Sequence, residues 1–124
     1  MGVHQQREGS LETLEQARKI IEIASERQAA DILLLDVAEI CGFADYFVIM
    51  SSLTPRHTEA LRQEIESGLK DTDITMLHRE GSAGSGWVLL DYGDIVVHIF
   101  SASEREYYRL ESLWQQGNTI VRIQ

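Results

Sequence analysis

Three aspartates of this chain invite a metal-dependent chemistry. Asp91 and Asp94 bracket the short segment between two apolar runs, and Asp45 precedes another apolar run. Carboxylates that converge on one point can hold Mg²⁺ for phosphoryl or nucleotidyl transfer. Aspartates beside a turn also accept hydrogen bonds from the backbone of that turn. We expect turn chemistry for Asp91 and Asp94, with a partner-contacting acid and a metal site as the alternatives.

Residues 80–86 have the glycine-rich composition of a phosphate-binding loop. Such loops aim backbone N–H groups and a helix N-terminus at the anion, and a lysine usually follows. Here the segment leads into an apolar run typical of a strand, and no lysine follows it. We therefore expect a flexible or partner-facing connection.

The candidate nucleophile and general bases are isolated from one another. Cys41 has no base near it in the sequence, which is typical of a small buried side chain. His98 lies on one face of an expected strand, which favours a packed and hydrogen-bonded histidine. Arg56 and His57 fall in the first turn of an expected helix, where they are either solvated or bind an anion. No catalytic set emerges, so we expect neither an enzyme nor a cofactor or metal site.

Two aromatic residues lie beside the acids. Trp87 opens an expected strand after the glycine-rich segment, so it is either a core anchor or a rim aromatic that a partner contacts. Tyr92 lies at the tip of an expected hairpin, where little core is within reach, and we expect it to be exposed. Aromatic side chains with neighbouring acids are typical of binding patches.

The composition places these residues in one small acidic domain. The chain has 124 residues, 44% of them hydrophobic, and a formal net charge of −9. This size suits one core, and the charge opposes binding to bare RNA or DNA, whose readers normally carry a basic face. A single cysteine excludes an internal disulfide, and no apolar run approaches the ~18 residues that span a bilayer. We expect a soluble, cytoplasmic protein, in which the acidity either only maintains solubility or attracts basic partners.

Three helices are expected to position the candidate residues. Amphipathic spacing predicts the first helix over residues 11–28, and Thr54 followed by Pro55 predicts the capped start of the second. Ser103 and Glu106 have the spacing of a capping box for the last helix. Trp114 lies on the apolar stripe of that helix and is expected in the core.

Short apolar runs predict the strands. They cover residues 32–37, 46–50, 74–78, 87–90 and 95–100, with 119–123 as an edge strand or a trailing end. The tight connection at residues 91–94 predicts an antiparallel hairpin, and both of its arms are apolar enough to be covered on both faces. This order predicts an α/β fold with a mixed β-sheet flanked by helices, because a purely parallel sheet would need a helix between every pair of strands.

Several segments resemble the ribosomal silencing factor family, also called Iojap-like. The most specific is the run from Trp87 to His98 with its flanks, Trp-Val-Leu-Leu-Asp-Tyr-Gly-Asp-Ile-Val-Val-His. The resembling segments are residues 44–49, 56–57, 79–81, 86–100, 104–110 and 113–114. The resemblance therefore covers about residues 11–114, with a flexible lead at 1–10 and a C-terminal tail at 115–124 on either side.

The resemblance implies a fold related to nucleotidyltransferases but without their catalytic motif. Asp45 and Phe47 stand where a metal-binding Asp-x-Asp pair would be sought, which agrees with that expectation. The family implies binding to the intersubunit side of the large ribosomal subunit, through ribosomal protein fourteen of that subunit. Such binding obstructs the small subunit and lowers translation when nutrients are short. Family members also form homodimers.

Carried over by position, the resemblance implies a partner-binding surface on the hairpin and the start of the last helix. The expected partner-binding residues are Trp87, Leu89, Asp91, Tyr92, Gly93, Asp94, His98, Glu104, Glu106, Tyr107 and Tyr108. Little direct contact with nucleic acid and none with a membrane is expected. The alternatives are a cryptic metal-dependent nucleotidyltransferase and a homodimeric adaptor without a ribosomal role.

Overall fold

The computed structural model describes residues 2–39, 41–113 and 118–123, and within them six strands form one mixed sheet. The strands are β1 (Ala30–Asp36), β2 (Tyr46–Ser52), β3 (His78–Ser82), β4 (Trp87–Asp91), β5 (Ile95–Ser101) and β6 (Asn118–Ile123). Their order across the sheet is β3-β4-β5-β2-β1-β6. The pair β2–β5 is parallel, and the other neighbouring pairs are antiparallel. The predicted mixed sheet is confirmed.

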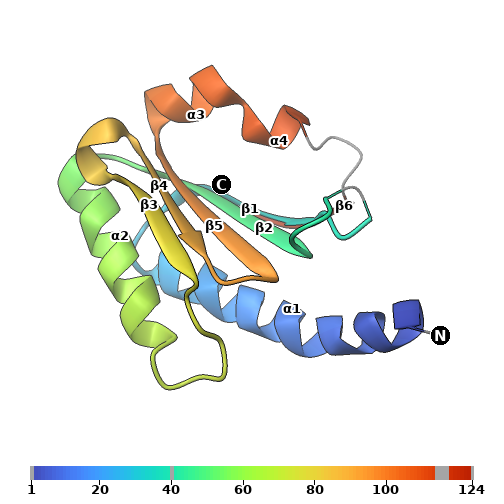
Figure 1. The fold of residues 1–124 in the computed structure, drawn as a ribbon. Helices are drawn as coiled ribbons and strands as arrows, with labels where there is room; N and C mark the ends of the chain where they lie inside the picture. Colours follow the sequence, from blue (N-terminus) through green and yellow to red (C-terminus); the bar gives the residue numbers. More distant parts are fainter. Residues whose placement is uncertain (1, 40, 114–117, 124) are drawn as a thin grey trace.

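Helices lie on both faces of this sheet but cover them unequally. The long helices α1 (Gly2–Glu26) and α2 (Pro55–Gly68) pack on one face, and the short α3 (Ala102–Tyr108) and α4 (Leu110–Leu113) lie on the other (Figure 1). None of the helices in the described part of the chain is long and apolar enough to cross a membrane. The predicted α/β architecture with flanking helices is therefore confirmed.

Two hydrophobic clusters hold the central strands, one on each face of the sheet. Ile32 and Val97 belong to the cluster under α1 and α2. Leu33 and Phe100 belong to the cluster on the α3 side. All seven positions of β2 are buried, which explains why its sequence is apolar without alternation.

The first helix is longer than its apolar pattern predicts. It begins at Gly2 instead of about Leu11, so the expected flexible lead is helical in the structure. Apolar periodicity marks only the turns that pack on the sheet, where Ala17, Ile20 and Ala24 are fully buried. The earlier turns give no such signal in the sequence.

The two capping predictions have opposite outcomes. Thr54 caps α2 ahead of Pro55, as predicted. The predicted cap at Ser103 is wrong, because Ser101 caps α3 by accepting a hydrogen bond from the Glu104 N–H at 3.2 Å. Strand β5 runs into α3 with no loop between them, so the helix begins before the pattern that predicts it.

The third strand is displaced from its predicted position. The apolar segment 74–78 is predicted as a strand, but β3 covers His78–Ser82 and all five of its residues are exposed. Ile74 and Met76 pack against the α1/α2 cluster from a connection, which explains the apolar signal. The polar β3 is a sheet edge paired only with β4, and Arg79 ties it to Glu66 of α2 at 3.0 Å. A 3₁₀ turn, η1 (Ala83–Ser85), then leads to β4.

The β4–β5 hairpin forms with the predicted antiparallel pairing. Gly93 provides the positive φ of 87° at its tip, and Asp91 Oδ1 accepts a hydrogen bond from the Gly93 N–H at 2.8 Å. The turn role predicted for Asp91 is confirmed. The expectation that both arms are covered on both faces holds for β5 but fails for β4, where buried and half-buried residues alternate.

The C-terminal segment adds a strand to the sheet. β6 pairs antiparallel with β1, with Ile32 opposite Ile123 and Asp36 opposite Asn118. Of the two alternatives left open for this segment, the edge strand is confirmed. The core position predicted for Trp114 lies outside the described residues.

Gly81→Ala should destabilise the fold strongly. Gly81 has a φ of 83°, and an added Cβ would lie 2.0 Å from the Trp87 carbonyl oxygen, so β3 and β4 would have to separate. We expect the free energy of unfolding to fall by about 2 kcal/mol or more, measured by urea titration. Gly84→Ala is the matched control, because its Cβ would meet nothing within 4 Å. Equal stability of the two variants would contradict the close approach of β3 to β4.

Candidate functional site

Within the described residues, helices leave most of the α3-side face of β3 and β4 uncovered. Because Ser101 both ends β5 and caps α3, the helix folds back mainly over β5 and β2, and it meets β4 where Tyr108 contacts Trp87. The side chains of β4 that point to this face are therefore half-buried. We call this surface the β4 face; its residues are His78, Glu80, Trp87, Leu89, Asp91, Glu104 and Tyr108.

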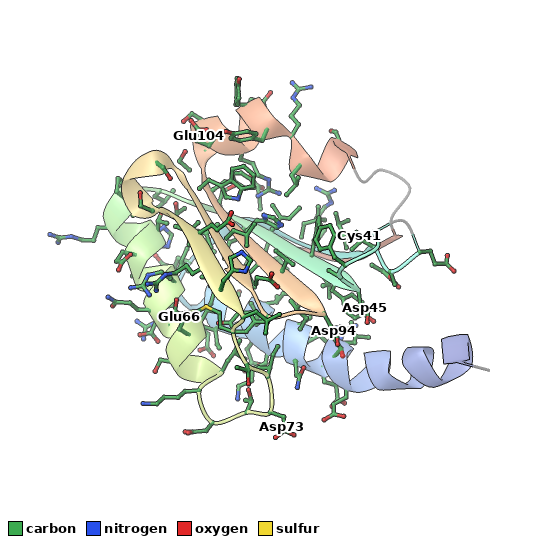
Figure 2. The ribbon with its side chains drawn as sticks, viewed as in Figure 1. Cys41, Asp45, Glu66, Asp73, Asp94 and Glu104 are labelled. Carbon is green, nitrogen blue, oxygen red and sulfur yellow. The ribbon has the colours of Figure 1, made fainter. Side chains whose placement is uncertain are left out.

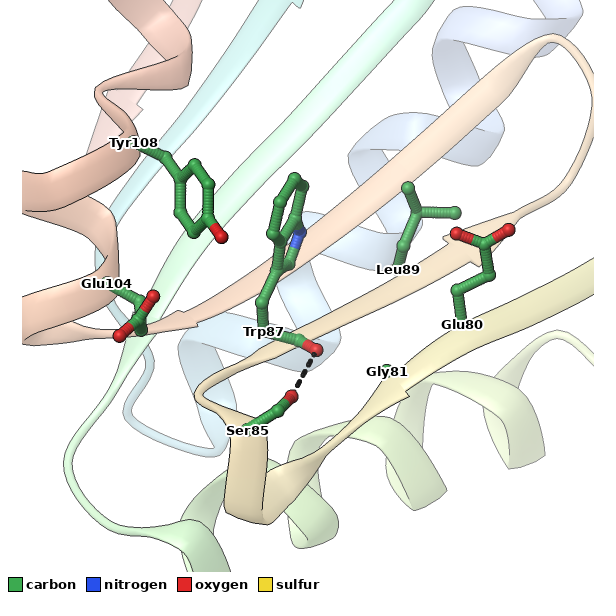
Figure 3. Close-up of a pocket in the computed structure, with 7 residues that line it drawn as sticks. All are labelled: Glu80, Gly81, Ser85, Trp87, Leu89, Glu104 and Tyr108. Atoms are coloured by element: carbon green, nitrogen blue, oxygen red, sulfur yellow. Dashed lines mark hydrogen bonds between the residues drawn. The ribbon is translucent and has the colours of Figure 1, made fainter.

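A pocket of about 220 Å³ lies in the β4 face, where Tyr108 leans over Trp87 (Figure 3). The two ring centroids are 4.6 Å apart, and the indole also stacks on Phe100 at 4.9 Å. Leu89 continues the apolar floor of the pocket, and Ser85 Oγ lies 3.2 Å from the Trp87 carbonyl oxygen. Trp87 thus has one side packed against the core and one side open, which combines the two alternatives predicted for it.

Carboxylates flank the aromatic pair. Glu80 and Glu104 lie on opposite sides of Trp87 (Figure 3). Farther along β4, the His78 ring lies between Glu80 Oε2 at 3.2 Å and Asp91 Oδ2 at 3.3 Å. Aromatic faces beside carboxylates attract the cationic head groups of Lys and Arg. The chemistry of the β4 face therefore suits a basic protein surface.

A buried arginine, Arg105, anchors helix α3 to the sheet. Arg105 is almost fully buried, and its Nη1 donates a hydrogen bond to Ser51 Oγ at 2.9 Å. This contact and the Ser101 cap hold the helix that carries Glu104 and Tyr108. Tyr107 points outward with 77% of its surface exposed and touches Tyr108 edge-on at 5.0 Å.

His98 is buried beneath the β4 face. Only 4% of its surface is exposed, and its Nδ1 accepts a hydrogen bond from Trp87 Nε1–H at 3.3 Å. Burial lowers the pKa of His98 to about 3, so the ring is neutral near pH 7. The packed, hydrogen-bonded histidine is confirmed, whereas the expectation that His98 touches a partner is wrong, because the residue does not reach the surface.

Tyr92 is also buried, and the prediction that it is exposed is wrong. Its side chain, 7% exposed, lies in the cluster under α1 and α2. Successive residues of a strand point to opposite faces, so Tyr92 follows Val88 and Leu90 away from the β4 face. Burial, with the nearby Glu66 carboxylate, raises the pKa of Tyr92 to about 12. Among the described residues, the hydroxyl of Tyr92 has no hydrogen-bond partner. Because its side chain is buried on the other side of the sheet, Tyr92 is not part of the β4 face.

The three aspartates do not converge on one site. Asp91 belongs to the β4 face, whereas Asp45 and Asp94 lie at the tip of the hairpin near Phe43 (Figure 2). These last three residues border a separate, mainly polar pocket of about 550 Å³, together with the buried Cys41. In the described ranges no three His, Cys, Asp or Glu side chains are placed to hold a metal ion.

The Arg56–His57 pair does not form an anion site. His57 Nε2 donates to the Arg27 carbonyl oxygen at 2.8 Å, and its Nδ1 accepts from the Leu53 N–H at 2.9 Å. The imidazole thereby ties the end of α1 to the start of α2. Both ring nitrogens serve the fold, while Arg56 lies exposed.

The structure divides the expected partner-binding residues into three groups. Those of the β4 face are Trp87, Leu89, Asp91, Glu104 and Tyr108. Those outside its pocket but reached by solvent are Gly93, Asp94, Glu106 and Tyr107, and those that are buried are Tyr92 and His98. The sequence pattern does not identify Glu80, which it assigns to a loop, or the supporting Arg105. A second hairpin, turning through the glycine-rich residues 83–86, would have placed Glu80 opposite Leu89.

Comparison with known proteins gives the family of this fold and surface. The family described as "Ribosomal silencing factor during starvation" matches residues 10–124. The chain belongs to the ribosomal silencing factor family. Its family domain therefore includes the C-terminal strand β6 as well as the segment expected from the motifs.

Relatives from several sources share this family. The ribosomal silencing factor RsfS of Bacillus subtilis is 39% identical over 101 residues, which cover 78% of this chain and 86% of that protein. A mouse protein named "Mitochondrial assembly of ribosomal large subunit protein 1" is 30% identical over 98 residues, 77% of this chain and 43% of that protein. These names describe ribosome-associated factors.

A solved structure shares the fold. The crystal structure of a Chromobacterium violaceum protein superposes with a TM-score of 0.78 at 27% identity, over 90% of this chain and 92% of that one. The mixed sheet with its flanking helices is therefore the fold of this silencing factor family.

Acid should destabilise the fold through His98. Below about pH 6.5 the unfolded chain protonates this imidazole, whereas the folded chain keeps it neutral until about pH 3. Unfolding then takes up a proton, so the His98 contribution should fall by ~1.4 kcal/mol per pH unit over that interval. Urea titrations of the wild type and His98→Leu at pH 7 and pH 5 isolate the His98 contribution to the free energy of unfolding, because the variant keeps every other titrating group. A stability difference between the two proteins that does not change with pH would contradict a neutral buried imidazole.

Proposed function

We propose that this silencing factor binds the large ribosomal subunit through its β4 face and contacts ribosomal protein fourteen of that subunit. The single observation that carries the proposal is the half-exposed aromatic pair Trp87–Tyr108, flanked by Glu80 and Glu104 where the sheet has no helical cover. Family membership supports a ribosomal partner. The name of the mouse relative, which refers to assembly of the ribosomal large subunit, supports a large-subunit partner.

The charge of the chain favours a protein contact over an RNA contact. A net charge of −9 is repelled by rRNA phosphates and attracted to a basic ribosomal protein. Carboxylates at the rim of an interface mainly raise the association rate, and desolvated aromatic anchors supply most of the affinity. We therefore assign affinity to Trp87, Leu89 and Tyr108, and steering to Glu80 and Glu104.

Steric exclusion explains how binding would silence the ribosome. If this protein occupies the intersubunit side of the large subunit, the small subunit cannot dock there at the same time. Each of the two ligands then weakens the binding of the other by the same factor, as thermodynamic linkage requires. This mechanism needs no catalytic residue and acts in the cytoplasm, where it would lower translation when nutrients are short.

Trp87→Ala and Tyr108→Ala should each weaken binding to purified large subunits. Loss of a central aromatic anchor costs about 2 kcal/mol, which is roughly a thirtyfold rise in Kd. Fluorescence anisotropy of labelled protein measures the Kd, and circular dichroism checks that each variant is folded. Ile123→Ala is the matched control, because it shortens a partly exposed apolar side chain on β6 at the opposite edge of the sheet. Wild-type affinity in both aromatic variants would place the interface elsewhere.

Adding this protein to separated subunits should reduce the yield of joined ribosomes. Sucrose-gradient sedimentation at saturating protein should show large subunits that carry the protein and free small subunits. Trp87→Ala should need a roughly thirtyfold higher concentration to give the same reduction. If joined ribosomes form in full while the protein remains bound to the large subunit, steric exclusion is wrong even though the binding proposal stands.

A further inference from the structure

The imidazole of His98 and the indole of Trp87 form a side-chain pair beneath the β4 face. Trp87 lies opposite Phe100 in the β4–β5 register, and His98 lies opposite Leu89, so the pair is diagonal on one face of the sheet. The indole N–H donates to His98 Nδ1 at 3.3 Å. Diagonal neighbours on antiparallel strands are within reach of aromatic side chains, so this contact needs no distortion of the strands.

The rest of the His98 ring is packed against aromatic side chains. Its centroid lies 4.9 Å from that of Phe47, with the rings nearly edge to face. Because Nδ1 accepts, the proton of the neutral ring must be on Nε2, and that buried atom has no hydrogen-bond partner among the described residues. A buried N–H without a partner is unfavourable, and an apolar residue of similar volume would avoid this cost. The Nδ1 acceptor is therefore the feature that an apolar residue could not supply.

The orientation of the indole determines the shape of the pocket. Trp87 forms its floor between Phe100 below and Tyr108 at the side, and the indole nitrogen points away from Tyr108 (Figure 3). Rotation of the ring about its side-chain bonds would move the indole edge into the pocket of about 220 Å³. An acceptor under the indole nitrogen opposes that rotation.

We propose that His98 is a positioning residue that holds the indole of Trp87 in the orientation that forms the β4-face pocket with Tyr108. His98 then acts on a partner only through Trp87, since it does not reach the surface itself. The effect on large-subunit binding rests on the proposed function. The effect on the indole does not, because it concerns this chain alone.

Two substitutions separate the acceptor from ordinary packing. His98→Leu keeps an apolar side chain of similar volume in place but removes the acceptor. His98→Asn leaves a small void, but its Oδ1 lies near the position of the imidazole Nδ1 and can accept from the indole. A purely structural role predicts that the asparagine variant is the more impaired of the two. A positioning role predicts that the leucine variant is.

The first measurement is hydrogen exchange of the Trp87 indole N–H by ¹⁵N-resolved NMR, with Trp87→Phe to assign the resonance. In His98→Leu we expect this N–H to exchange about three- to tenfold faster than in the wild type, which corresponds to loss of one neutral hydrogen bond. His98→Asn should restore most of the protection. An indole that exchanges equally in the wild type and His98→Leu would overturn the proposal.

The second measurement is the Kd for purified large subunits. We expect His98→Leu to bind about three- to tenfold more weakly while remaining folded, and His98→Asn to bind more tightly than His98→Leu despite its void. Val97→Ala is the matched control, because it opens a void at the neighbouring β5 position on the opposite face of the sheet. It should change neither the indole exchange nor the Kd.

The outcomes separate this proposal from the proposed function. Equal Kd values for the wild type and His98→Leu, with a wild type that binds, would overturn the positioning role. A wild type that does not bind large subunits would overturn the proposed function, and the indole exchange would then decide alone whether His98 holds Trp87.

Discussion

The direct passage from β5 into α3 is the constraint on which the proposed binding surface, the β4 face, depends. Ser101 is at once the last residue of the strand and the cap of the helix, so α3 has no loop with which to reach the edge of the sheet. The helix covers β5 and β2, and Arg105 fixes it there through Ser51. The α3-side face of β4 is left open as a result, and an open apolar sheet face is unfavourable unless a partner covers it.

The contacts of Trp87 connect the β4 face to the core. Trp87 stacks on Phe100, which is fully buried, and hydrogen-bonds to His98. In our proposal these contacts fix the orientation of the indole before a partner binds. A side chain that is ordered in the free protein loses less conformational entropy on binding. Trp87 is half-buried because it is the middle ring of a stack. Phe100 is the inner ring, in the core, and Tyr108 is the outer ring, at the pocket.

The sequence predicts the central elements well because those elements pack on one or both faces. The apolar runs of β2 and β5, the Thr54 cap and the tight hairpin are local patterns with local causes, and the structure confirms each. Edge elements are predicted poorly. All of β3 is exposed and polar, so its sequence lacks the apolar pattern that predicts a strand. The apolar Ile74 and Met76 lie in the preceding connection, and the sequence therefore predicts the strand there.

By itself, the sequence determined the mixed α/β order, the acidic charge and the family. Composition, periodicity and a long specific motif are properties of the residues alone and do not depend on how the chain packs. It also brought Trp87, Leu89, Glu104 and Tyr108 together as binding candidates. Only the tertiary structure decided that Tyr92 lies inside and that Glu80 joins the pocket. The physical reason is that a residue's exposure depends on what packs over its face of the sheet. Here that cover comes from helices distant in sequence on one face and from a helix that stops short on the other.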